Sequence, residues 1–148
     1  MRDTRLRALA DAPDAFATTH AEARQRPDAW WIDWARRSAE AETQAMYLAW
    51  LDGRAVGIAG AFDDNGTWHV ISMWVDPAER GRGIGRRLLD AVVAFASARG
   101  ARELILGVTD GNVAARALYE RYGFVDDGGT EQLRSNPSLM LREMRLSI

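Results

Sequence analysis

The stretch VDPAERGRGIGRRLL, residues 75–89, places three glycines and four arginines between an apolar run and an amphipathic pattern. Gly81, Gly83 and Gly85 allow a tight turn and the close approach of a ligand to the backbone. The N–H groups up to about Arg86 are then free at the start of a helix, where the helix dipole also favours an anion. A pyrophosphate fits this arrangement. The alternative is that the glycines only make a turn and the arginines form a solvated basic rim.

Two common nucleotide-binding loops do not match this stretch. A Walker A loop needs a lysine after its last glycine, and the chain contains no lysine. The dinucleotide fingerprint needs a third glycine where this sequence has Arg86. The anion therefore belongs to another class of ligand.

The composition is that of an ordinary soluble protein. The 148 residues, 47% of them hydrophobic and 27% charged, predict a single domain spanning residues 1–148. The absence of cysteine excludes disulfides and thiolate catalysis, and two histidines are too few for a histidine-based metal site, so no metal is expected. A net charge of −2 does not favour nucleic acid, and no apolar run approaches the roughly 20 residues of a membrane span. A cytoplasmic location is expected.

The first half of the chain predicts helices followed by a meander of strands. Residues 2–42 carry helical spacing that is broken at DAPDAF and resumes after Pro27. Asp52-Gly53 and Asn65-Gly66 then separate three apolar runs, which predicts two tight hairpins between about Ala45 and Val75.

The second half alternates helices and strands. A helix follows the glycine-rich turn and stops at Gly100, RELILGV is a short buried strand, and a second helix begins with Asn112 as its N-cap. The strands that flank the first of these helices are expected to be parallel. Two further strands, joined by the loop RSNPS, complete an α/β fold with a mixed sheet flanked by helices.

Two motifs together indicate a family. VDPAERGRGIG, followed one helix and one strand later by GNVAARALYERYGF, resembles the acetyl-CoA-binding core of the GCN5-related N-acetyltransferase (GNAT) family. The resemblance is strong from about Ala55 to Phe124 and looser outside that range. It implies a GNAT-like fold and acetyl-CoA as co-substrate.

The resemblance also assigns the cofactor contacts. The turn would hold the pyrophosphate through backbone amides, and the end of the preceding strand would splay and pair with the pantetheine arm. Side chains at the start of the second helix would contact the same arm. The residues implied are Met73, Trp74, Val75, Arg80, Gly81, Arg82, Gly83, Ile84, Gly85, Arg86, Asn112, Ala115 and Arg116.

The implied reaction is direct attack of a primary amine, from a small molecule or a peptide, on the thioester. Tyr119 takes the family's proposed general-acid position, two helical turns after Asn112, and would protonate the departing thiolate. Packing is the alternative role for Tyr119, although Tyr122 is the expected core tyrosine. His69 is the candidate base, since imidazole exchanges protons near neutral pH, or else it faces solvent or packs beside Trp68. Glu131 is the second candidate.

The sequence departs from the family at its beginning. The family has a strand before its first helix, whereas Met1 leads directly into helical sequence, so that first strand is expected to be missing. The strand 45–51 would then be an open edge, available to a second copy in a homodimer or covered by a loop. Candidates for the walls of the amine site are Trp30, Trp34, Trp68 and Arg134.

Two other functions compete with the enzyme. A non-catalytic acyl-CoA-binding or regulatory module would keep the pyrophosphate turn but would not need the Tyr119 hydroxyl. A nucleic-acid-binding domain could use ERGRGIGRR as a basic patch, but the acidic chain as a whole and the lack of RNA-binding motifs argue against it.

Overall fold

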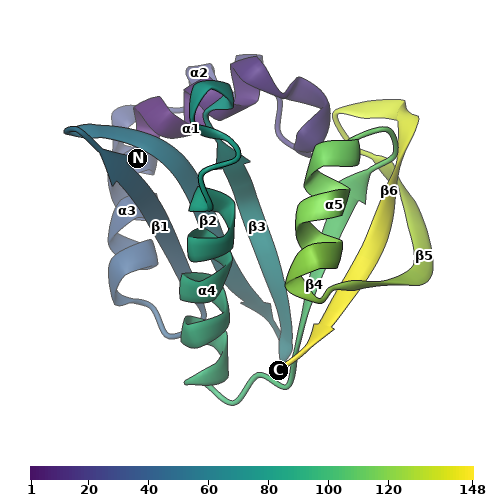
Figure 1. Ribbon diagram of the computed structural model, residues 1–148. Helices are drawn as coiled ribbons and strands as arrows, with labels where there is room; N and C mark the ends of the chain where they lie inside the picture. The colour runs from purple at the N-terminus through teal and green to yellow at the C-terminus, as the bar shows by residue number, and fades with distance from the viewer.

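A six-stranded mixed sheet forms the centre of the computed structural model, which describes residues 1–148 (Figure 1). Its spatial order is β1-β2-β3-β4-β6-β5, and all neighbouring strands are antiparallel except β3 and β4, which are parallel as expected. The strands are β1 (Gln44–Leu51), β2 (Arg54–Asp64), β3 (Thr67–Val75), β4 (Glu103–Thr109), β5 (Val125–Leu133) and β6 (Asn136–Ser147).

Both predicted hairpin turns are present. Asp52 and Gly53 have φ angles of 48° and 76°, and Asn65 and Gly66 have φ angles of 52° and 93°. Positive φ at both central residues twists a two-residue turn in the sense that adjacent antiparallel strands require. These local signals therefore fix the first three strands of the sheet.

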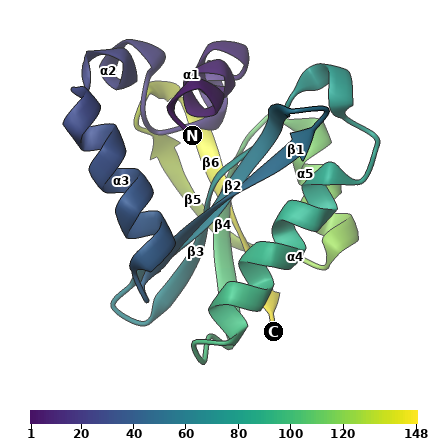
Figure 2. The same ribbon diagram turned by 90° about the vertical axis from the view of Figure 1, so that its left-hand side faces the viewer.

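Helices cover both faces of the sheet (Figure 2). On one face lie α4 (Ile84–Ser97) and α5 (Val113–Tyr122), and on the other lie α1 (Arg2–Asp11), α2 (His20–Gln25) and α3 (Asp28–Glu40). The larger buried cluster lies under α4 and α5; the smaller joins α1 and α3 to the sheet and includes Leu9, Trp31, Ile58 and Trp74.

The predicted edge of the sheet is confirmed. β1 pairs only with β2, and no strand precedes α1 in this structure. Trp50, on β1, is 65% exposed. The pairing of a second copy along this edge stays a prediction.

The predicted loop RSNPS is too long. β5 ends at Leu133 and β6 already begins at Asn136, so only Arg134 and Ser135 connect them. Pro137 is tolerated because it stands at the beginning of β6, before the pairing of β6 with β4 starts at Leu141.

Candidate active site

The glycine-rich turn presents free backbone amides at the start of α4. Gly81 and Gly83 both have φ of +77°, and Gly83 is the N-cap of the helix. The first amide after this turn that donates within the chain is that of Arg87, to the Gly83 carbonyl at 3.1 Å. The preceding N–H groups are therefore available to an anion, and the positive end of the α4 dipole lies in the same place.

Gly85 has a different role from the two glycines before it. A Cβ atom there would lie 2.9 Å from Leu118 Cδ2 and 3.3 Å from Met73 Cε. The first turn of α4 therefore packs directly against α5 and the end of β3. This close contact brings the free amides next to the second helix of the site.

β3 and β4 separate beside this turn. Their ladder has a single registered pair, His69 with Ile105, although β3 continues to Val75. The pairing of β3 with β2 shifts register between Ile71 and Trp74, and Ser72 within this irregular stretch has a positive φ of 58°. Such a bulge re-aims the strand, and Figure 1 shows β3 and β4 diverging toward the end where α1 lies.

A cavity of about 1070 Å³ lies between the end of β3 and the starts of α4 and α5. The residues predicted to bind the cofactor line it, apart from Arg82 and Arg116: Met73, Trp74, Val75, Arg80, Gly81, Gly83, Ile84, Gly85, Arg86, Asn112 and Ala115. The Arg80 side chain spans its rim, since Nε donates to the Val75 carbonyl and Nη2 to Asp11 Oδ2, both at 3.0 Å.

A second cavity of about 470 Å³ adjoins the first. Both candidate bases, His69 and Glu131, line it, and the two cavities share a wall that includes Met73, Asn112 and Tyr119. Tyr119 therefore borders both cavities.

Tyr119 is only 6% exposed, and burial alone raises its pKa well above the ordinary tyrosine value. Its hydroxyl is therefore held in the protonated form that a proton donor needs. The expectation that Tyr122 would be the core tyrosine is wrong. Tyr122 is half-buried, and its hydroxyl donates to Asp90 at 2.8 Å; burial and this carboxylate raise its pKa to about 12.

Comparison with known proteins decides the family. The family model described as "Acetyltransferase (GNAT) family" matches residues 6–124. The chain belongs to the GNAT family. The match covers most of the length of the chain.

Two curated relatives and one solved structure illustrate the likeness. Mycothiol acetyltransferase of Beutenbergia cavernae is 33% identical over 121 residues, which are 80% of this chain and 38% of the relative. N-acetylaspartate synthetase of Homo sapiens is 38% identical over 88 residues, 58% of this chain and 29% of the relative. The chain thus spans less than half the length of these relatives. The protein yncA of Salmonella typhimurium, solved with its cofactor acetyl-CoA, is 21% identical with a TM-score of 0.78, covering 99% of this chain and 85% of the other.

Asn112 acts as the N-cap of α5 in this GNAT chain. Its Oδ1 accepts a hydrogen bond from the Ala115 amide at 3.2 Å. The cap uses the carbonyl oxygen of the side chain, which leaves the Nδ2 donor for a ligand. Since Asn112 lines both cavities, the N-cap role and the predicted cofactor contact are compatible.

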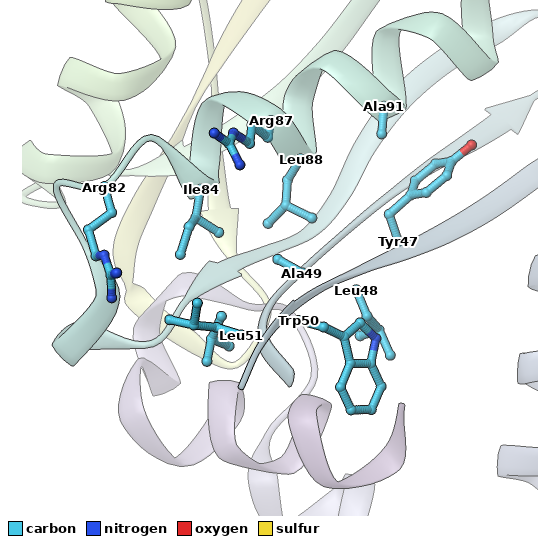
Figure 3. A pocket seen from close by; sticks show the side chains of 11 residues that line it. Tyr47, Leu48, Ala49, Trp50, Leu51, Arg82, Ile84, Arg87, Leu88 and Ala91 are labelled. Atoms are coloured by element: carbon cyan, nitrogen blue, oxygen red, sulfur yellow. The ribbon is translucent and has the colours of Figure 1, made fainter. Parts of the chain in front are cut away.

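Two residues predicted to contact the cofactor, Arg116 and Arg82, do not line the larger cavity, called the cofactor cavity below because it is lined by the other predicted cofactor residues. Arg116 is one position beyond Ala115, so it turns about 100° around the helix, and its guanidinium pairs with Glu120 at 2.8 Å and Asp126 at 3.2 Å. Arg82 forms an ion pair with Glu79. Figure 3 shows the Arg82 side chain among those lining a separate cavity of about 450 Å³ between β1 and α4.

The four residues predicted to form the walls of the amine site do not line the smaller cavity. Trp30 and Trp34 pack with Trp31 against the α1 side of the sheet, with ring centroids 5.0–5.7 Å apart. Trp68 is buried beside Phe95 under α4. Arg134 pairs with Glu22 at 2.7 Å. These side chains build the scaffold around the site.

The structure adds residues that the sequence did not indicate. Leu118 and Arg121 line the cofactor cavity on the same face of α5, a pattern that helical spacing from Ala114 and Ala115 would have revealed. Asp11 and Phe16 come from the N-terminal segment, for which no local signal exists. No group of three or more His, Cys, Asp or Glu side chains that could hold a metal ion is present, and no helix is long and apolar enough to cross a membrane.

Proposed function

We propose that this chain is an acetyl-CoA-dependent N-acetyltransferase that acts on a primary amine. The observation that supports it most is the position of Tyr119, a protonated hydroxyl in the wall between two adjoining cavities. Membership of the GNAT family and the match to mycothiol acetyltransferase over 80% of the chain support the same activity.

The larger cavity fits coenzyme A. The free amides from Gly81 to Arg86 suit a pyrophosphate, and the end of β3, which is unpaired on the side toward β4, suits the amide groups of a pantetheine arm. Acetyl-CoA supplies the activated acetyl group as a thioester with a thiolate leaving group. The splay of β3 from β4 provides the space in which that thioester would meet Tyr119.

The chain's own groups would then move two protons. The amine nitrogen bonds to the acetyl carbon as the carbon–sulfur bond breaks, and the Tyr119 hydroxyl donates its proton to the departing sulfur. The proton lost by the amine passes to His69 or Glu131, directly or through water, since both line the smaller cavity. No covalent enzyme intermediate is required.

A non-catalytic acyl-CoA-binding module is the competing function, and two measurements separate it from the enzyme. Calorimetric titration should show tight binding of acetyl-CoA and much weaker binding of ADP, because ADP lacks the pantetheine arm. Release of free thiol from acetyl-CoA, followed with a chromogenic disulfide, should depend on added amine. The assay has no protein background because the chain lacks cysteine. Binding without amine-dependent thiol release would support the module, and no binding would contradict both functions.

A further inference from the structure

Arg5 stands out among the arginines of α1. Its Nη1 atom is buried and has no hydrogen-bond partner. By contrast, Arg2 pairs with Asp28, and Arg7 donates to Asp76 at 2.5 Å and to the Ala55 carbonyl at 2.7 Å. A buried cationic group that lacks a partner is costly, so it indicates a binding partner from outside the chain.

The Arg5 guanidinium remains a cation in this position. Burial, helped by the charge of Arg26, lowers the pKa of Arg5 to about 10, still far above neutral pH. The guanidinium stacks on the Phe16 ring, with Cζ 4.3 Å from the centroid. Stacking uses the flat face of the group, and the guanidinium N–H groups other than the enclosed Nη1, which also make no hydrogen bond within the chain, are left for an anion.

The position of Arg5 shows which ligand would supply the anion. Arg5 lines the smaller cavity, with His69 and Glu131, and does not line the cofactor cavity. The cofactor phosphates are accounted for by the amides of the glycine-rich turn. The anion therefore belongs to the amine that receives the acetyl group.

The rest of the smaller cavity limits the size and polarity of that amine. Its volume of about 470 Å³ suits a small molecule. Apolar side chains line it from several elements: Phe62, Ile71, Leu133 and Leu141. Carboxylates and phosphates both match a planar guanidinium with two parallel hydrogen bonds, and a carboxylate is the smaller of the two for a cavity of this size.

We propose that the acceptor is a free α-amino acid with an apolar side chain, whose carboxylate pairs with Arg5 while its amine faces Tyr119 and the candidate bases. This inference rests on the proposed acetyltransferase activity and adds the class of its substrate. Because Arg5 would bind the free α-carboxylate directly, a peptide N-terminus or a simple alkylamine, which lacks that group, would be a poor acceptor.

The test compares each acid with its own amide. Thiol release is measured with L-phenylalanine, L-leucine and L-methionine and with their α-amides, at saturating acetyl-CoA. The amides cannot form the hydrogen-bonded charge pair with Arg5, so kcat/KM should be roughly 10- to 100-fold higher for the acids. Near neutral pH a larger fraction of each amide is present as the neutral amine, so the expected preference runs against the availability of the nucleophile.

The variant Arg5→Gln should remove that preference. KM for the acids should rise by roughly the same 10- to 100-fold, with kcat and acetyl-CoA affinity largely kept. Thermal stability should change little, because removal of an unpaired buried charge offsets the loss of the stacking on Phe16, whereas loss of a structural arginine would lower it clearly. Arg2→Gln, on the same helix but outside the cavity, is the matched control and should leave the preference intact.

The result that would overturn the proposal is equal use of acids and amides, or a preference that survives Arg5→Gln. If no amine releases thiol, the proposed activity fails, and the carboxylate site is then tested by calorimetry alone. L-phenylalanine should bind the CoA-saturated protein, and L-phenylalaninamide or the Arg5→Gln variant should not. No binding of L-phenylalanine would refute the carboxylate site by itself.

Discussion

The cofactor side and the acceptor side of this molecule are built in opposite ways. The cofactor cavity comes largely from one continuous part of the chain, Met73 to Tyr122, and its key feature is the backbone of the glycine-rich turn. The smaller cavity, the proposed acceptor site, is lined from α1, the β2–β3 hairpin, β4, α5 and the β5–β6 pair, and its key features are side chains. A substitution should therefore affect either cofactor affinity or acceptor use, with Tyr119 between the two.

Tyr119→Phe should have the largest effect. It removes only the hydroxyl from the shared wall, so kcat should fall roughly 10²- to 10⁴-fold while acetyl-CoA affinity is nearly unchanged. Because burial raises the pKa of Tyr119, the donor form persists on the alkaline side, and kcat of the parent enzyme should not decline below about pH 10 through this group. Unchanged turnover in the variant would remove Tyr119 from the chemistry. Tyr122→Phe is the matched control.

Substitution of the two candidate bases should have the next largest effect and should show which of them accepts the proton. His69→Gln and Glu131→Gln each remove one proton acceptor from the acceptor cavity. The variant that lacks the true base should lose about 10²-fold in kcat/KM near neutral pH and recover part of it as the pH rises and more amine is neutral. The pH profile of kcat/KM for both variants is the measurement. If both keep full activity, water alone takes the proton.

Gly83→Ala should weaken cofactor binding without affecting use of the amine. The φ of +77° costs an alanine roughly 1–2 kcal/mol, and relief of that strain would displace the free amides. Acetyl-CoA affinity should fall about tenfold, with KM for the amine unchanged. Gly53→Ala is a matched control, since Gly53 has φ of +76° but stands in the β1–β2 turn. Equal loss of affinity in both variants would mean that general destabilisation is the cause.

The same division explains what the sequence predicted. The hairpins, the α4 start and the α5 cap each depend on a few neighbouring residues with strong backbone preferences, and they were found in place. Arg5 and Asp11 reach the site only because α1 packs across the end of the sheet, which is a long-range contact. The core role predicted for Tyr122 was wrong, because spacing alone does not tell which tyrosine is more deeply buried: Tyr119 belongs to the buried cluster, whereas Tyr122 only packs against it.

Two arginines of α5 give the smallest and most local test. Arg121 lines the cofactor cavity, whereas Arg116 pairs with Glu120 and Asp126 outside it. Arg121→Ala should weaken acetyl-CoA binding a few-fold, because it removes an exposed positive charge from the wall of the cofactor cavity. The loss of affinity should be smaller at high salt, where such a charge is screened. Arg116→Ala should leave affinity unchanged and lower the free energy of unfolding by less than about 1 kcal/mol, as is usual for exposed ion pairs. Calorimetry at two salt concentrations distinguishes them. The reverse outcome, with Arg116 needed and Arg121 dispensable, would mean that α5 presents a different face to the cofactor than its lining residues indicate.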